Sequence, residues 1–188
     1  MSHPKLYMVL IGCKPEGRHT EQHDIFFGIA ESMKALLPDI IAFWPEAKGV
    51  LHIDGWREVH QVDGFDIMIE ERCANKAEQS QQLFFINLGG YKENEFDEFH
   101  YKLIVAAEDK AEAVKRAKAT AFYKHTQFES AKSHIDDKYG VDVDDLYQIE
   151  EVLNDATKKQ FSIVLIPSNE VREDQLHLGY FKLSSFSK

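Results

Sequence analysis

The sequence predicts an α+β protein built from tandem β-β-α-β-β repeats that form mainly antiparallel sheets, followed by a C-terminal hairpin. Three observations carry this prediction. Segments of the chain resemble one another at a nearly constant spacing, each begins with a short apolar run that ends in Gly or Pro, and few segments have helical periodicity. Because so few helices cannot cover both faces of a large sheet, we expect two similar lobes whose sheets pack together, or a dimer that covers the remaining face.

The repeat is defined by one shift along the chain, which places Gly12 on Gly89 and the apolar residues 6–11 on residues 83–88. A slightly longer shift is needed after the middle of each repeat, so we infer an insertion in the second copy. The polar residues that match under these shifts are Glu21 with Glu98, His23 with His100, His52 with His134, and Asp54 with Asp136.

These matches divide the chain into residues 5–76 as the first repeat unit, residues 82–156 as the second, and residues 160–184 as the C-terminal hairpin. The hairpin is interpreted as a partial third copy, in which His177 aligns with His100 and Gln175 stands where Glu98 stood. The opening part of the unit is therefore present three times and its closing part twice.

Each unit opens with two apolar runs joined by a polar loop, which is the pattern of an antiparallel hairpin. In the first unit these runs are residues 6–11 and the run that follows His23. The unit closes with two further strands, at residues 51–59 and 65–71, joined by a turn at residues 62–64. The corresponding strands of the second unit are residues 134–141 and 146–153, although residues 145–153 fit a short helix equally well.

A helix is predicted in the middle of each unit. In the second unit Asp109 can cap it, with Glu112 three residues later, and alanines follow near helical spacing. In the first unit Ser32 can cap a helix through Leu36, but Pro38 removes a backbone donor inside it. We therefore expect the first helix to be kinked, broken or started late.

Composition limits the classes of protein and partner. The chain has 188 residues, of which 44% are hydrophobic, so it can form a packed core as one domain or two small lobes. The formal net charge of -10 disfavours nucleic acid, whose binding needs a basic surface. No apolar run is long enough for a membrane span or a signal peptide. Two cysteines, Cys13 and Cys73, fit free thiols in a reducing cytosol, so we expect a cytoplasmic protein.

The candidate site consists of polar residues that recur two positions apart in the repeats. Residues i and i+2 of a strand share a face, about 7 Å apart, so their side chains can converge on one ion or substrate. Imidazoles and carboxylates together can bind Zn, Mn or Fe, and an open coordination position would let the ion activate water. The candidate ligand or substrate-binding residues are Glu21, His23, His52, Asp54, Glu98, His100, His134 and Asp136.

A structural role explains the same pattern. A His at the start of a strand often bonds a loop carbonyl, and an Asp after it can hold the following turn. Three interpretations therefore stay open: pairing that only holds turns, binding of a ligand without metal, and a metal site. The acidic residues Asp142, Asp144 and Asp145 lack the EF-hand spacing and are interpreted as a solvated turn. Cys13 and the aromatic residues Phe43, Trp44 and Trp56 are interpreted as core.

The residues Glu21-x-His23, His52-Ile-Asp54 and Val62-Asp-Gly64 together resemble domain-of-unknown-function family 1543, over roughly residues 6 to 153. In that family the domain occurs in one or two copies in small bacterial proteins. The resemblance implies a bacterial origin and a cytosolic setting, and it brings no activity, substrate or cofactor. The second unit departs from the pattern, because it has Asp137 where the first has Gly55.

The function predicted from these observations is a non-catalytic binding or assembly module built from a duplicated unit, with a homodimer as a possible state. The alternative is a metal-dependent hydrolase that uses Glu21, His23, His52 and Asp54. The identities of the partner, the substrate and the cofactor are left open.

Overall fold

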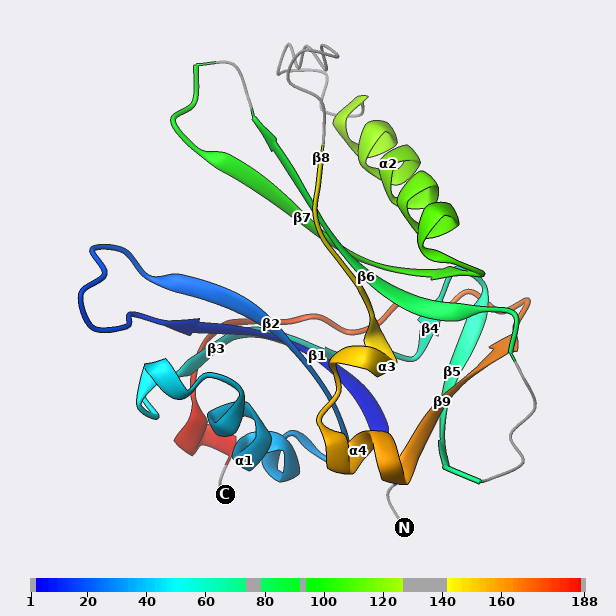
Figure 1. The fold of residues 1–188 in the computed structure, drawn as a ribbon, viewed down its shortest axis with the longest axis horizontal. Helices are drawn as coiled ribbons and strands as arrows, with labels where there is room; N and C mark the ends of the chain where they lie inside the picture. The colour runs from blue at the N-terminus through cyan, green and yellow to red at the C-terminus, as the bar shows by residue number, and fades with distance from the viewer. Residues whose placement is uncertain (1–2, 74–78, 92–93, 127–141, 187–188) are drawn as a thin grey trace. The chain divides into compact units, whose positions relative to one another are not determined.

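The structure is a computed structural model that describes residues 3–73, 79–91, 94–126 and 142–186 (Figure 1). The chain forms two compact units: unit 1 consists of Met1–Ala77 and Leu153–Lys188, and unit 2 consists of Glu78–Val152. The strand pairs in both units are antiparallel, and helices accompany the sheets. The predicted α+β class with mainly antiparallel sheets is therefore confirmed.

The main sheet of unit 1 has the strand order β10-β3-β1-β2. Its strands are β1 (Lys5–Cys13), β2 (Gln22–Ala30), β3 (His52–Glu58) and β10 (His177–Lys182). β1 lies inside the sheet, and its side chains Tyr7, Val9 and Ile11 are at most 1% exposed. This alternation of buried apolar residues is why the run folds as a strand with one face on the core.

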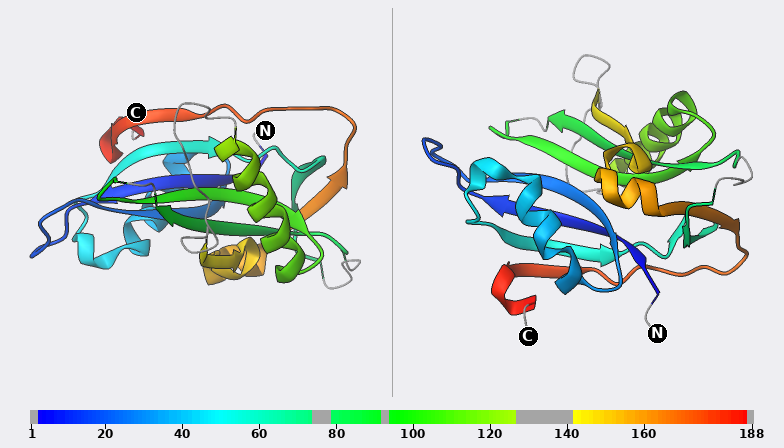
Figure 2. Two further views of the ribbon diagram at one scale, coloured as in Figure 1. Left: turned by 90° about the horizontal axis from the view of Figure 1, so that it is seen from above. Right: turned by 60° about the horizontal axis from the view of Figure 1, so that its bottom comes forward.

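One face of this sheet is covered by α1 (Met33–Phe43), which crosses the strands in the right-hand view of Figure 2. The predicted cap is present, because the Ser32 side chain accepts a hydrogen bond from Ala35 N at 3.4 Å. α1 is one continuous helix, neither broken at Pro38 nor started after it. Burial of Met33, Leu36 and Ile40 on the sheet offsets the cost of an interior proline. A short 3-10 helix, η1 (Pro45–Ala47), follows.

A second, smaller sheet of unit 1 has the order β4-β5-β9. The sequence predicted that residues 51–59 and 65–71 pair through a turn at 62–64. That turn instead joins β4 (Gln61–Val62) to β5 (Phe65–Glu71), while β3 stays in the main sheet. Asp63 and Gly64 both have positive φ, 49° and 82°, which matches a type I′ hairpin.

The C-terminal hairpin predicted for residues 160–184 is wrong. After α4 (Asp155–Gln160), the strand β9 (Phe161–Pro167) pairs with β5, and β10 pairs with β3. The polar loop between β9 and β10 is long enough for each strand to reach a different sheet edge, so it imposes no hairpin. The chain then ends in the 3-10 helix η2 (Leu183–Phe186).

Unit 2 contains a sheet of order β7-β6-β8 and the helix α2 (Lys110–Thr126), which packs on β6 and β7. Its strands are β6 (Gln82–Tyr91), β7 (Glu98–Ala107) and β8 (Asp142–Gln148), and α3 (Ile149–Val152) follows β8. Residues 145–153 are thus strand first and helix afterwards. Ala113 and Ala117 are fully buried, and their small side chains let α2 approach the sheet closely.

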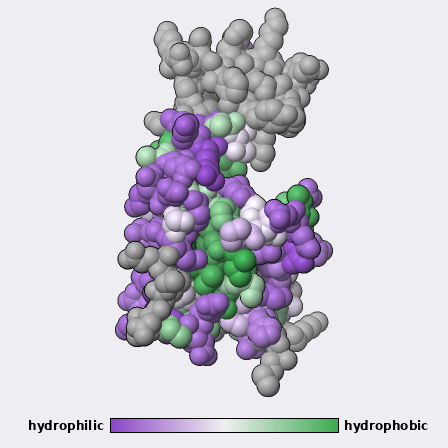
Figure 3. Space-filling view, turned by 90° about the vertical axis from the view of Figure 1, so that its right-hand side faces the viewer, coloured by the Kyte–Doolittle hydropathy of each residue, from purple (hydrophilic) through white to green (hydrophobic). Residues whose placement is uncertain are grey.

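An area of apolar side chains lies among hydrophilic ones on the face seen in Figure 3, the side on which β5 and β9 are drawn in Figure 1. On the small sheet of unit 1, Met68 is 48% exposed and Ile166 45% exposed. Their strand register, with Met68 opposite Val164 and Asp66 opposite Ile166, puts both on the same face.

Within the described ranges, no helix combines the length and the apolar character that crossing a membrane requires.

The start of α2 makes a test of the predicted cap. Glu112 N donates to Asp109 Oδ1 at 2.8 Å, and Glu108 N donates to Glu112 Oε2 at 2.8 Å, which is a reciprocal capping arrangement. We expect Asp109→Ala to lower the free energy of unfolding by about 1 kcal/mol. Urea denaturation measures this, and the exposed Asp97→Ala in the same unit is the matched control. Equal unfolding midpoints for the two variants would contradict the cap.

Candidate functional site

The unit 1 site is built where three adjacent strands meet. Gly12 of β1 pairs with His23 of β2 on one side and with His52 of β3 on the other. Directly paired residues of neighbouring strands point to the same face of a sheet. The two imidazoles therefore lie on one face, on either side of a position that has no side chain.

Gly12 makes this convergence possible. A Cβ atom at position 12 would overlap the imidazole Nε2 of His52 and would lie 2.5 Å from Asp54 Oδ2. Both contacts are shorter than nonbonded packing allows. The space above β1 is thus filled by the side chains of β3, and any residue larger than glycine would displace them.

Asp54 enters the same site through a β-bulge. Ile53 pairs with Ile11, whereas Gly55 pairs with Leu10, so Asp54 is an extra residue of β3 opposite β1. Bulges re-aim side chains and occur often beside functional sites. Here the bulge directs the Asp54 carboxylate to the two histidines.

The four side chains contact one another through their polar ends. The His52 Nε2 lies 3.0 Å from Glu21 Oε1 and 3.3 Å from Asp54 Oδ2. The His23 Nε2 lies 3.3 Å from the same Asp54 oxygen and 3.9 Å from Glu21 Oε2. The Nε2 atom of each histidine therefore faces both carboxylates. The ligand atoms of Glu21, His23 and His52 all lie within 4.8 Å of one another, and Asp54 Oδ2 lies 3.3 Å from both histidines.

The inner half of the site is buried and lacks hydrogen bonds. His52 is 6% exposed, and neither its Nε2 nor the Asp54 Oδ2 has a hydrogen-bond partner among the described residues. Buried polar atoms are normally paired, because leaving one unpaired costs about 1–3 kcal/mol. The outer half is open, since the His23 side chain is 43% exposed and that of Glu21 45%.

A similar cluster lies in unit 2. Gly89 of β6 pairs with His100 of β7, and β8 has a register shift that leaves Asp144 as the extra residue, between Val143 and Asp145. The His100 Nε2 lies 3.3 Å from Asp144 Oδ2 and 3.9 Å from Glu98 Oε2. A Cβ at position 89 would overlap the Asp144 carboxylate. All three side chains of this cluster are about one-third exposed or more, at 41%, 35% and 32% for Glu98, His100 and Asp144.

The structure changes the predicted membership of the unit 2 cluster. His134 and Asp136 lie outside the described residues. In strand register, the residue opposite Gly89 on β8 is Asp142, at the position that His52 has opposite Gly12. Asp144, interpreted from the sequence as part of a solvated turn, faces His100 instead. The signal that could have found it is the alternation Asp142-x-Asp144, which repeats the form of His52-x-Asp54 with the first residue changed.

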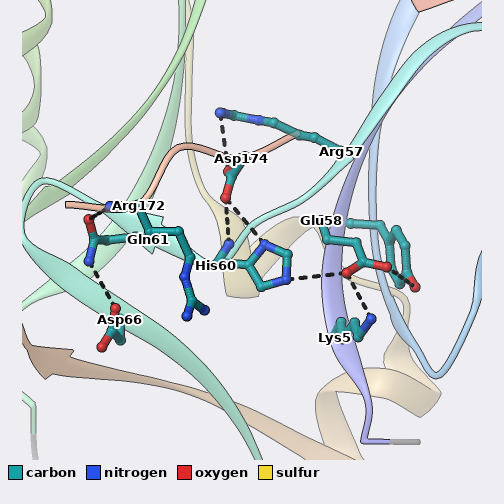
Figure 4. Close-up of polar contacts among 9 residues, drawn as sticks. Lys5, Arg57, Glu58, His60, Gln61, Asp66, Arg172 and Asp174 are labelled. Carbon is teal, nitrogen blue, oxygen red and sulfur yellow. Dashed lines mark hydrogen bonds and ion pairs between the residues drawn. The ribbon is translucent and has the colours of Figure 1, made fainter. Parts of the chain in front are cut away.

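A second polar cluster of unit 1, drawn in Figure 4, has a different character. The Asp174 side chain is 2% exposed, its Oδ1 accepts a hydrogen bond from His60 N at 2.9 Å, and its Oδ2 lies 3.4 Å from Arg57 Nη1. The ring of His60 lies between two carboxylates, 3.4 Å from Asp174 Oδ1 and 3.2 Å from Glu58 Oε2. Burial lowers the pKa of Arg57, while Asp174 opposes that effect. A carboxylate that a backbone donor and a guanidinium hold in this way ties two segments together.

Of the residues interpreted as core, Cys13 is buried, and Trp44 and Trp56 pack against the core of unit 1. Phe43 meets Phe26 edge-on but is 41% exposed, so its interpretation as core is wrong. Trp56 also stacks on His177 with ring centroids 3.8 Å apart. Burial raises the pKa of the Cys13 thiol, and the carboxylate of Glu21 adds to that rise. Cys13 thus packs as an apolar side chain beside the site.

Residues 18–69 match the family model of Domain of Unknown Function (DUF1543), which confirms the resemblance expected from the sequence. The matched segment contains Glu21, His23, His52 and Asp54. The structure is similar to that of a protein Il1583 from Idiomarina loihiensis, with a TM-score of 0.64 and 24% sequence identity over 96% of this chain and 98% of that chain. This likeness shows the fold. A search of curated proteins finds no match.

The two thiols give a test of the burial next to the site. Cys13 is 2% exposed and Cys73 is exposed. A raised pKa leaves less thiolate at a given pH. We therefore expect Ellman's reagent to modify Cys73 quickly and Cys13 only on unfolding. The Cys73→Ser variant should lose the fast phase, and a fast phase that survives in this variant would contradict the burial of Cys13.

Proposed function

We propose that unit 1 binds one divalent transition-metal ion through Glu21, His23, His52 and Asp54. The observation that carries the proposal is the pair His52 Nε2 and Asp54 Oδ2, which are buried, 3.3 Å apart and without hydrogen-bond partners. A cation between these atoms and the outer ligands would satisfy both. It would also offset the mutual repulsion of the two carboxylates.

The alternative role of holding turns is less favoured by this geometry. A turn-holding imidazole bonds a backbone carbonyl or N–H group. In contrast, His52 and His23 each face the carboxylates of both Glu21, just before β2, and Asp54 of β3. The Asp174 cluster has such a structural role, because its carboxylate accepts a backbone hydrogen bond from His60 N.

The donor set indicates the class of metal. Two imidazole nitrogens and two carboxylate oxygens suit Zn²⁺, Fe²⁺ or Mn²⁺, and the set lacks the thiolate that copper(I) prefers. Cys13 follows Gly12 directly in β1 and belongs to the buried core of unit 1, so its thiol lies on the opposite face of the sheet from the site.

The cluster of unit 2 supports the inference that the two units arose by duplication of a β-β-α-β segment. Both units have a glycine paired with a histidine, a bulged aspartate beside it, and the same 3.3 Å and 3.9 Å distances to the imidazole. With one imidazole among its described side chains, the unit 2 cluster would bind a harder ion, such as Mn²⁺ or Mg²⁺, and bind it more weakly.

The function proposed for the chain is therefore that of a metal-binding module. Hydrolysis is a second candidate because Glu21 and His23 are nearly half exposed, so water can reach an ion held at the inner residues. Activity toward a p-nitrophenyl ester or phosphate separates the two. Metal-dependent turnover that disappears in His52→Ala would favour the hydrolase, and absence of turnover in the metal-loaded protein would favour the module. The homodimer stays a prediction, which light scattering tests directly.

The ligand set makes a prediction for metal affinity. In a His100→Ala background, which removes the imidazole of the cluster described in unit 2, we expect one tightly bound Zn²⁺ per chain by calorimetry and elemental analysis. Adding His23→Ala should weaken that affinity at least about 100-fold, more than loss of an outer-shell partner usually costs. His23 is half exposed, so this change leaves the core intact. His19→Ala, an exposed imidazole in the loop between β1 and β2, is the matched control. Zn²⁺ affinity that is the same in the His23→Ala and His19→Ala variants would refute the site.

Metal should also stabilise the fold. An ion that binds the folded chain and not the unfolded one adds about 2.7 kcal/mol when its concentration is 100 times the dissociation constant. We expect Zn²⁺ to raise the melting temperature and a chelator to reverse the rise. The increase should be lost in the His52→Gln variant, which keeps a polar side chain at the buried position. An equal rise in this variant would mean that the ion binds elsewhere.

A further inference from the structure

We infer that Tyr180 is a positioning residue that holds the His52 imidazole in its metal-binding orientation. This inference rests on the metal site proposed above. The two rings are stacked, with centroids 4.3 Å apart and an angle of 27° between their planes. His52 is 6% exposed and Tyr180 68% exposed. The tyrosine therefore lies on the outside of the contact, with one face of the imidazole beneath it.

Tyr180 reaches His52 because β10 adds to the outer edge of β3. Lys182 pairs with His52, so Tyr180, two residues earlier, lies diagonally across from it, within reach of an aromatic side chain. Between the pairs Leu178–Gly55 and Phe181–Ile53, both Gly179 and Tyr180 stand opposite Asp54. Gly179 has a φ of 138°, a conformation that favours glycine. This irregularity in β10 thus coincides with the bulge of β3 that carries a ligand.

The segment that carries Tyr180 is fixed by contacts both before and after this residue in the chain. Before Tyr180, the buried Asp174 carboxylate binds His60 and Arg57, and His177 stacks on Trp56 with ring planes 6° apart. After it, Phe181 packs against the core of unit 1. These contacts on either side fix the backbone at Tyr180, so its ring stays beside His52 although it is exposed.

The stack limits the orientations of the imidazole. With Tyr180 on one face, the ring is kept in the plane in which Nε2 lies 3.0 Å from Glu21 Oε1 and 3.3 Å from Asp54 Oδ2. Residues that orient a metal-ligating histidine raise metal affinity, because they remove the cost of ordering it on binding. In unit 2 the order β7-β6-β8 leaves β8 at the sheet edge, so its described part has no strand in the place of β10.

Three variants test this inference in the His100→Ala background. Tyr180→Ala removes the ring, Tyr180→Phe keeps the stack and removes the hydroxyl, and Leu178→Ala removes an exposed side chain two residues away on β10. We expect Tyr180→Ala to weaken Zn²⁺ binding about 10-fold or more, Tyr180→Phe to bind within about 2-fold of the parent, and Leu178→Ala to match it. Unchanged affinity in Tyr180→Ala would overturn the inference.

Two spectroscopic readouts separate positioning from stability and from failure of the metal site itself. The visible spectrum of the Co²⁺-loaded protein reports ligand geometry. It should change in Tyr180→Ala and not in Leu178→Ala, while the two variants unfold at the same urea concentration. In metal-free protein, the ring current of Tyr180 should shift the NMR signals of His52, and Tyr180→Ala alone should abolish that shift. If no variant binds metal and this shift is present, the proposed function fails while Tyr180 still orients His52. A missing shift in the parent overturns the inference, whether or not metal binds. Tyr180→Leu replaces Tyr180→Ala if the latter does not fold.

Discussion

A missing side chain on the central strand is the constraint on which the unit 1 site depends. β1 separates the strands that carry His23 and His52, and two side chains on such next-but-one strands can meet only if nothing stands between them. Gly12 leaves that space, and the neighbouring residues of β1 are buried in the core, so the strand cannot move aside. Packing on one face of the sheet therefore fixes the position of the polar cluster on the other.

The presence of a cationic side chain distinguishes the two polar clusters of unit 1. Asp174 Oδ1 accepts a backbone hydrogen bond, and Asp174 Oδ2, which has no hydrogen bond, lies 3.4 Å from the guanidinium of Arg57. At the other cluster, the buried nitrogen of His52 meets carboxylate oxygens without a hydrogen bond. The first arrangement contains its own cation, Arg57, and joins the loop before β10 to β3. The second has no Lys or Arg among its four side chains, which is why we propose a metal ion there.

Local sequence patterns predicted what local interactions determine. The recurrence of Glu-x-His after a glycine-ended strand identified Glu21, His23, Glu98 and His100, because hairpin register follows from two adjacent runs. Asp144 was missed since a bulge and an altered first residue hide its likeness to Asp54. The pairing of β10 with β3 was also missed. Strand partners far apart in the chain depend on which sheet edge is free, and neither periodicity nor composition records that.

The C-terminal strand β10 gives unit 1 a feature that the described part of unit 2 does not have. His52 and Asp54 lie on a strand whose inner edge is closed by β1 and whose outer edge is closed by β10. Without β10, β3 would be an edge strand, and one face of the His52 ring would lie open to water. Unit 2 has that simpler arrangement in its described part, where β8 lies at the edge of the sheet. The difference between a site that β10 covers and one without such a cover thus comes from a strand with no counterpart in the described part of unit 2. A second difference lies in the strand register, because Asp142 stands opposite Gly89 where His52 stands opposite Gly12.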